Sequence, residues 1–127
     1  WANAVGLMQL ILPTARSMAK RLGLGGAVTA KTLRDPATNI RLGAAYLAYL
    51  SEKFQGNDAL VIAGYNAGEG AVKKWLKERP GQGLDMFVET IPYSQTRGYT
   101  KRVLASLATY RFLYGGSRSI LVPCMTP

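Results

Sequence analysis

Seven carboxylic acids and a complete lack of histidine limit the chemistry that this chain of 127 residues could carry out. Without histidine, the chain cannot form a Ser-His-Asp or Cys-His catalytic group, or the usual histidine-containing zinc site. Its single cysteine, Cys124, cannot form an internal disulfide, and we interpret it as an incidental surface residue, with a reactive thiol as the alternative. The carboxyl groups are therefore the first candidates for acid–base chemistry.

Most of the acids have an ordinary structural explanation. Five of them begin helices or turns, or lie beside lysines on exposed faces: Asp35, Glu52, Asp58, Glu78 and Asp85. Only Glu69 and Glu89 adjoin the motifs described below, and Glu69 is most simply a favourable contact at a helix N-terminus. A proton donor needs an apolar setting that raises its pKa. The residues alone show no acid/base pair.

The net charge of +9, from 16 Lys and Arg against 7 Asp and Glu, favours a polyanionic partner. Nucleic acid, anionic lipid and an acidic cell-wall polymer all fit this charge. The densest basic cluster, Lys73, Lys74, Lys77 and Arg79, lacks interleaved aromatic residues and is typical of a solvated helix face. We therefore expect no nucleic-acid function. No apolar stretch is long enough for a transmembrane segment.

Helical periodicity and end signals predict an all-α fold. We expect helices over residues 13–22, 36–54, 59–66, 69–77, 84–88 and 94–114, with a glycine-rich loop over 23–32. Asp35 should cap the second helix, and the third, apolar all round, should be buried. Steps of three and four predict one apolar face with Ile40, Gly43, Leu47, Leu50 and Phe54. The domain should occupy residues 1–114, followed by a C-terminal tail, 115–127.

Four segments have a more specific pattern than any single acid. They are Gly6-Leu7-Met8-Gln9 before Pro13-Thr14-Ala15, Asp35-Pro36-Ala37-Thr38-Asn39-Ile40, Tyr65-Asn66-Ala67-Gly68, and Ile91-Pro92-Tyr93-Ser94-Gln95-Thr96-Arg97-Gly98-Tyr99. Taken singly, each has an ordinary interpretation: Met8, Tyr65 and Tyr99 as core residues, and residues 66–68 as a helix end. Their joint occurrence favours a binding groove instead. Trp75, at helical spacing with Val72 and Leu76, is interpreted as core.

In this order, across about residues 3–112, the segments resemble those of the soluble lytic transglycosylases, which cut the glycan strands of bacterial peptidoglycan. The resemblance implies a goose-lysozyme-like helical fold and requires no metal or cofactor. In that family, one glutamate protonates the oxygen between N-acetylmuramic acid and N-acetylglucosamine. It then helps the muramyl 6-hydroxyl close onto C1, which gives a 1,6-anhydro sugar without adding water.

The resemblance also implies roles for individual residues. Met8 and Gln9 would line the groove around the acid, and Tyr65 would hydrogen-bond near it. Asn66 would help to position the sugar, and Tyr99 would reach the same region from the last helix. Gln95 stands where the family usually has glutamate, so that it keeps the hydrogen bonding but loses the charge.

The family's catalytic glutamate belongs to a Glu-Ser segment about ten residues before Trp1, so the resemblance assigns it to no residue of this chain. We therefore expect an N-terminally truncated domain: an enzyme when intact, and inactive as residues 1–127. The alternative is a non-catalytic glycan-binding module. The expected partner is the glycan strand of peptidoglycan, in the periplasmic or extracellular part of a bacterial cell envelope. The oligomeric state is not indicated.

Overall fold

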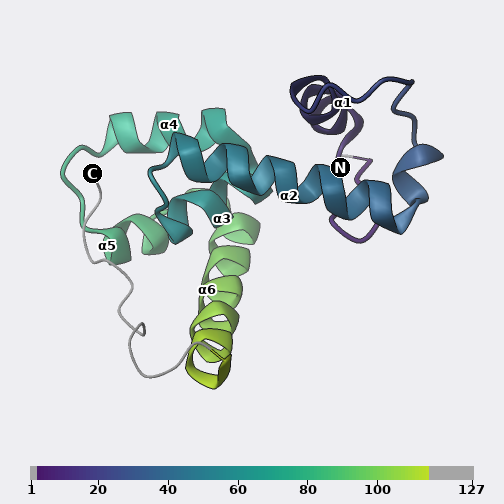
Figure 1. Cartoon of the computed structure of the whole chain (residues 1–127). Coiled ribbons are helices and arrows are strands. Elements are labelled where there is room, and N and C mark those ends of the chain that lie inside the picture. The colour runs from purple at the N-terminus through teal and green to yellow at the C-terminus, as the bar shows by residue number, and fades with distance from the viewer. Residues whose placement is uncertain (1–2, 115–127) are drawn as a thin grey trace. The chain divides into compact units, whose positions relative to one another are not determined.

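A computed structural model describes residues 3–114, in which six α-helices and one short 3-10 helix follow one another along the chain (Figure 1). The described part contains no β-strand, which confirms the all-α prediction; its only extended pairing is an isolated antiparallel bridge between Val5 and Leu10. The predicted tail, 115–127, lies outside the described residues. The chain divides into two compact units, one ending at Tyr49 and the other beginning at Leu50.

In the first unit, α1 (Leu12–Arg21) is a short amphipathic helix. Proline in its first turn suits a position where no backbone donor is needed. Ala15, Met18 and Ala19 face inward, and the cations of the last turn, Lys20 and Arg21, complement the negative end of the helix dipole. Gly23, with a φ of +63°, then turns the chain away from the helix axis.

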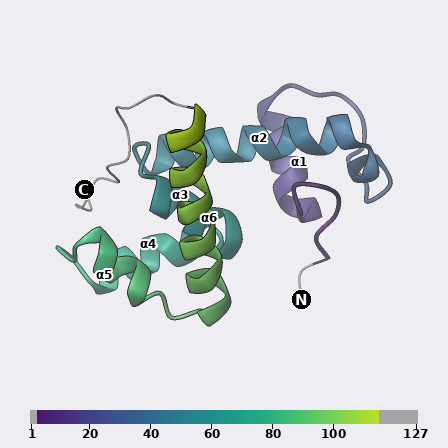
Figure 2. The same cartoon turned by 90° about the horizontal axis from the view of Figure 1, so that it is seen from below.

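A short 3-10 helix, η1 (Thr32–Arg34), leads into α2 (Pro36–Lys53). The Asp35 carboxylate accepts hydrogen bonds from the Thr38 hydroxyl, at 2.6 Å, and from the Thr38 backbone N–H, at 2.8 Å. These bonds, the hydroxyl's first, hold the pKa of Asp35 below its usual value, and they confirm the predicted cap. In both views, α1 runs across the direction of the N-terminal half of α2 (Figures 1 and 2).

The buried face at the start of α2 differs from the one that the apolar spacing predicts. Ile40 is 49% exposed, whereas Asn39 and Leu42 are completely buried. The other expected members are buried or half-buried: Gly43, Leu47, Leu50 and Phe54. The prediction for Ile40 was wrong because a polar side chain, Asn39, holds the inward position of this turn.

The second unit is built around α3 (Asp58–Ala67). Asn57 caps it by accepting a hydrogen bond from the Leu60 N–H at 3.3 Å. Residues 59–64 are all buried, as the continuous apolar run predicts. Gly64 lets α3 pack tightly, since a Cβ there would lie 2.9 Å from the Phe54 ring. Both α4 (Glu69–Glu78) and α6 (Ser94–Tyr114) pack against α3.

Trp75 on α4 is a core residue, as predicted. It is 3% exposed, and its ring meets that of Tyr93 edge to face, with centroids 5.2 Å apart. Tyr93 lies between α5 (Leu84–Glu89) and α6. The contact fixes the segment that precedes α6 against α4.

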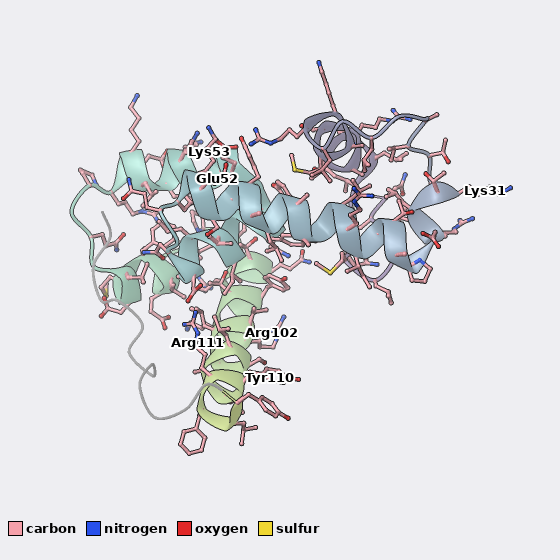
Figure 3. All side chains as sticks on the ribbon, viewed as in Figure 1. Lys31, Glu52, Lys53, Arg102, Tyr110 and Arg111 are labelled. Atoms are coloured by element: carbon pink, nitrogen blue, oxygen red, sulfur yellow. The ribbon has the colours of Figure 1, made fainter. Side chains whose placement is uncertain are left out.

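The C-terminal turns of α6 are exposed on several sides and extend beyond the other helices of the second unit (Figure 1). Figure 3 labels two of their residues, Tyr110 and Arg111. Tyr110 stacks on Tyr114, and Arg111 forms an ion pair with Asp58 at 2.8 Å. This pair joins the end of α6 to the start of α3. None of the described helices is both long enough and apolar enough to span a bilayer.

Candidate functional site

The Gly6–Gln9 segment of the first unit is a tight turn closed at its base. Val5 and Leu10 exchange two backbone hydrogen bonds, of 2.9 and 3.1 Å, across it. Gly6 and Gln9 both have left-handed backbone, with φ of +75° and +49°. The Gln9 side chain donates from Nε2 to the Gly6 carbonyl at 2.8 Å. Because a carbonyl can only accept, this bond identifies the Gln9 atom involved as nitrogen.

Asn39 holds this turn in place from the start of α2. Its Oδ1 accepts from the Met8 N–H at 2.7 Å, and its Nδ2 donates to the carbonyls of Val5, at 2.9 Å, and Leu33, at 2.8 Å. One buried carboxamide therefore satisfies three backbone groups from two segments. Buried polar groups need such partners, which explains why a polar residue occupies the apolar side of a helix.

Met8 packs directly onto the backbone of α2. A Cβ added to Gly43 would lie 2.7 Å from both Cβ and Cγ of Met8, so only glycine leaves room for this side chain. Met8 remains half-exposed, while Leu7, at the tip of the turn, is 71% exposed. The structure thus places Met8 and Gln9 in one rigid turn, with Met8 half-exposed and Gln9 exposed.

The Tyr65-Asn66-Ala67-Gly68 segment forms the last turn of α3. Tyr65 is half-buried, and Asn66 is exposed. The Oδ1 atom of Asn66 accepts a hydrogen bond from the hydroxyl of Thr96 at 2.7 Å, across 30 residues of sequence. Gly68, with a φ of +89°, ends α3 and starts α4. The segment therefore ends a helix and also contacts α6.

Two further predicted residues, Gln95 and Tyr99, lie on α6, one turn apart. Gln95 is exposed in the first turn, and Tyr99 is half-buried in the second. Burial raises the pKa of the Tyr99 phenol above its ordinary value near 10. The phenol therefore keeps its proton at neutral pH and can donate a hydrogen bond.

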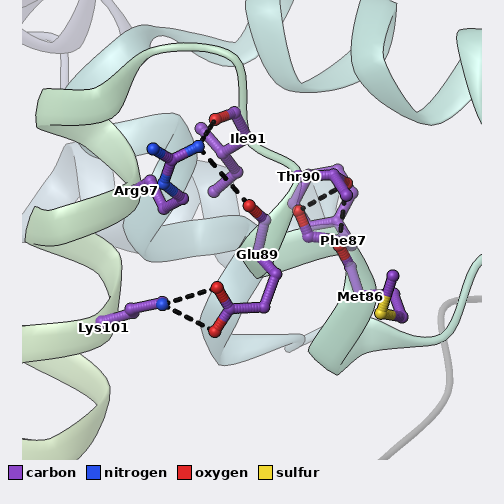
Figure 4. A network of polar contacts seen from close by, with 7 residues as sticks. All are labelled: Met86, Phe87, Glu89, Thr90, Ile91, Arg97 and Lys101. Atoms are coloured by element: carbon purple, nitrogen blue, oxygen red, sulfur yellow. Dashed lines mark hydrogen bonds and ion pairs between the residues drawn. The ribbon is translucent and has the colours of Figure 1, made fainter.

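The connection between α5 and α6 is held by arginine and lysine side chains (Figure 4). Arg97 donates to the carbonyl of Ile91 at 3.2 Å and more weakly to that of Glu89 at 3.5 Å. Arg79 donates to the carbonyl of Thr90 at 2.8 Å. The last carbonyls of a helix lack partners within it, so these contacts stabilise the end of α5 and fix where α6 begins.

The two acids next to the motifs both pair with lysines. Glu69 pairs with Lys73 one turn along α4, and Glu89 is 57% exposed with both carboxylate oxygens facing Lys101 (Figure 4), at 2.6 Å. A proton donor in glycosidic bond cleavage needs an apolar setting instead. Across residues 3–114, no three acids or cysteines gather closely enough to hold a metal ion.

Sequence reasoning missed Asn39 and Thr96 as contributors to the candidate site. Both are polar residues that are at least 97% buried. A signal for Asn39 was present, because asparagine is disfavoured in helix interiors and Asn39 lies three residues after the first residue of α2. Thr96 had no local signal, since its partner Asn66 is 30 residues away.

Comparisons with known proteins agree with the motifs. The transglycosylase SLT domain family matches residues 1–87. The soluble lytic murein transglycosylase of Escherichia coli (strain K12) is 42% identical over 121 residues, which cover 94% of this chain and 19% of that protein.

Solved structures give the same result. The 70 kDa soluble lytic transglycosylase of Escherichia coli matches with a TM-score of 0.84 and 42% identity, over 94% of this chain and 19% of that one. An inactive glutamate-to-glutamine variant of the lytic transglycosylase Slt from Pseudomonas aeruginosa matches with a TM-score of 0.81 and 41% identity, over 93% of this chain and 19% of that one. The chain thus spans less than a fifth of the length of these relatives.

Proposed function

This chain belongs to the transglycosylase SLT domain family, and on that premise we propose that it is part of a peptidoglycan lytic transglycosylase. The protein would cleave the β-1,4 bond between N-acetylmuramic acid and N-acetylglucosamine and leave a 1,6-anhydro end. The observation that carries the proposal is that the chain keeps the family's segments within the fold of a soluble lytic transglycosylase. The same premise makes the bacterial cell envelope the expected location.

On this proposal, each of the two units contributes a cluster of residues that binds glycan. Gln9 offers a polar side chain from a turn that Asn39 makes rigid, and Met8 offers an apolar edge beside it. In the second unit, Asn66 and Tyr99 offer hydrogen-bond donors suited to the many oxygens of a sugar. Apolar contact and fixed polar groups together are typical of ligand sites.

The proton donor is proposed to be a glutamate outside residues 1–127. All seven acids of the chain lie among the described residues, and none combines burial with an apolar setting. The two nearest the motifs pair with lysines. That replacing one glutamate inactivates the Pseudomonas aeruginosa enzyme fits a mechanism with one essential acid. Residues 1–127 alone would then bind glycan without cleaving it.

The same observation about the acids favours the second candidate, a glycan-binding module without catalysis. The two functions differ in the product they leave. A lytic transglycosylase releases muropeptides that end in 1,6-anhydro sugar and are lighter by one water than the products of hydrolysis. A binding module retains glycan strands and releases nothing.

The test is digestion of purified peptidoglycan with the protein that carries this chain, followed by mass spectrometry of the released fragments. Anhydro-muropeptides are the expected products. Products that contain the added water would refute the proposed reaction, and bound glycan without release would establish the binding module.

A second test concerns Tyr65. Replacing it with phenylalanine removes only the hydroxyl, so the thermal midpoint of unfolding should stay close to that of the parent. Release of anhydro-muropeptides should fall at least about tenfold, because a lost hydrogen bond in the transition state costs about 1.4 kcal/mol or more. Unchanged release by the folded variant would remove Tyr65 from the site.

A further inference from the structure

The hydrogen bond between Thr96 and Asn66 joins a buried group to an exposed one. Thr96, in the first turn of α6, is 3% exposed, whereas Asn66, in the last turn of α3, faces solvent. The Thr96 hydroxyl donates to Oδ1 of Asn66 at 2.7 Å. The buried hydroxyl therefore uses the carbonyl end of the exposed carboxamide.

This contact gives the carboxamide of Asn66 a direction. An exposed carboxamide without such a bond can rotate by half a turn, which exchanges its acceptor and donor ends. With Oδ1 engaged by Thr96, the NH₂ group is the end that remains available to a ligand. Asn66 therefore presents two N–H donors.

The position of Thr96 is itself fixed by the elements around it. Its helix packs against α3, and the backbone N–H of Arg97 donates to the Tyr93 carbonyl at 2.9 Å in the first turn. The Arg97 side chain holds the carbonyls at the end of α5 (Figure 4). The hydroxyl can therefore direct Asn66 from a rigid base.

We propose that Thr96 is a positioning residue that sets Asn66 to donate to the acetamido carbonyl of a sugar, and that this pair selects N-acetylated glycan. The inference rests on the proposed function. An acetamido oxygen can only accept hydrogen bonds, so it complements the NH₂ group of Asn66. A sugar without its acetyl group carries an ammonium, which can only donate and would face two donors. A site that leaves buried or fixed polar groups unpaired rejects such a ligand.

The experiment compares native glycan strands from peptidoglycan with the same strands after chemical removal of their N-acetyl groups, using the whole protein that carries this chain. Asn66→Asp keeps the size and the bond from Thr96 but replaces the donors with acceptors. It should weaken binding of native strands about tenfold or more and shift the preference toward de-N-acetylated strands.

Variants of Thr96 separate positioning from direct contact. Thr96→Val removes the hydroxyl at nearly constant volume and should raise KM for native strands about threefold to tenfold, with kcat within about twofold. Thr96→Ser should restore the parent's KM. Thr109→Val is the matched control, since that hydroxyl donates only to its own helix, at the Ala105 carbonyl; its KM should not change.

The outcomes distinguish this inference from the proposed function. If the parent protein binds neither kind of strand, the proposed function fails and this inference fails with it. If the parent binds native strands but Asn66→Asp keeps the same preference, only the selection by Asn66 is refuted. An unchanged KM in folded Thr96→Val refutes the positioning role. If Thr96→Val does not fold, NMR of Thr96→Ser replaces this test. The signals of the Asn66 side-chain amide should shift during titration with native strands. No shift on binding would refute the contact between Asn66 and the glycan.

Discussion

Replacing Asn39 should strongly lower the stability of the first unit. Its carboxamide makes three hydrogen bonds, of 2.7, 2.9 and 2.8 Å, to the Met8 N–H and to the carbonyls of Val5 and Leu33. Asn39→Ala removes all three at once. The bond to the Leu33 carbonyl is buried, and the bonds to Met8 and Val5 are partly buried, so water cannot readily take the place of the lost carboxamide.

The expected cost follows from the number of bonds. A typical intramolecular hydrogen bond contributes about 1 kcal/mol net, which gives about 3 kcal/mol for three. Leaving the Leu33 carbonyl unpaired in a buried setting raises the total toward about 5 kcal/mol, because an unsatisfied buried group costs about 1 to 3 kcal/mol. Whole domains are stable by about 5 to 15 kcal/mol. The variant should therefore lose a large part of the free energy of unfolding of the first unit.

Urea unfolding followed by circular dichroism measures this cost, with Asn57→Ala as the control. Asn57 is also a buried asparagine but makes a single cap bond, to the Leu60 N–H at 3.3 Å, and its loss should cost about 1 kcal/mol. An equal loss in the two variants would refute the reasoning that Asn39 supports three groups.

Asn39→Asp adds a dependence on pH. A carboxylate at this buried position would face the two carbonyls of Val5 and Leu33, so its pKa in the folded state should exceed the unfolded value of about 3.9. The sign follows from linkage: stability is highest below the unfolded pKa and falls as the pH rises through the folded one. Stability that rose with pH would contradict this assignment.

Three other predictions concern single side chains. Gly6→Ala should cost about 2 to 4 kcal/mol in urea unfolding, because φ is +75° and a Cβ would lie 2.2 Å from Asn39 Nδ2, whereas Gly25→Ala, with open space around it, should stay within about 0.5 kcal/mol. The raised pKa of Tyr99 predicts that the free energy of unfolding is undiminished below about pH 10 and falls as the pH rises from there through the raised pKa. Tyr99→Phe should remove this part of the decline. An identical pH profile in the parent and the variant would contradict the prediction. Arg97→Met should lower the free energy of unfolding by about 1 to 2 kcal/mol, against no measurable change for the exposed Arg102→Met, because it loses the donors to two carbonyls at the end of α5.

Most of the helical framework could be predicted from the sequence, because its signals are local. Asp35 before Pro36, the apolar run of α3 and the glycine after it each act within a few residues, and the structure confirms them. The cap and the buried run need no knowledge of the rest of the fold. The Ala59–Gly64 segment shows this most clearly, since every residue in it is buried.

What could not be predicted depends on contacts between distant segments. Ile40 was expected on the buried face of α2 because it continues an apolar spacing, but the inward position belongs to Asn39, whose partners lie six, 31 and 34 residues away. The bond from Thr96 to Asn66 spans 30 residues. Apolar periodicity depends on hydrophobic side chains alone. It therefore does not predict a polar side chain that is buried because it hydrogen-bonds to backbone groups. The roles of Met8, Gln9, Tyr65, Asn66, Gln95 and Tyr99 toward glycan stay predictions.

The support that Asn39 gives to the Gly6–Gln9 turn has a consequence for how this segment can vary. All three of its bonds go to backbone atoms, so the path of the turn does not depend on which side chain stands at position 7, where Leu7 is 71% exposed. Mutations there can accumulate without altering the loop's shape. A lineage could then change what the turn contacts through position 7 while keeping its scaffold, because the constraint falls on Asn39 and on the backbone it holds.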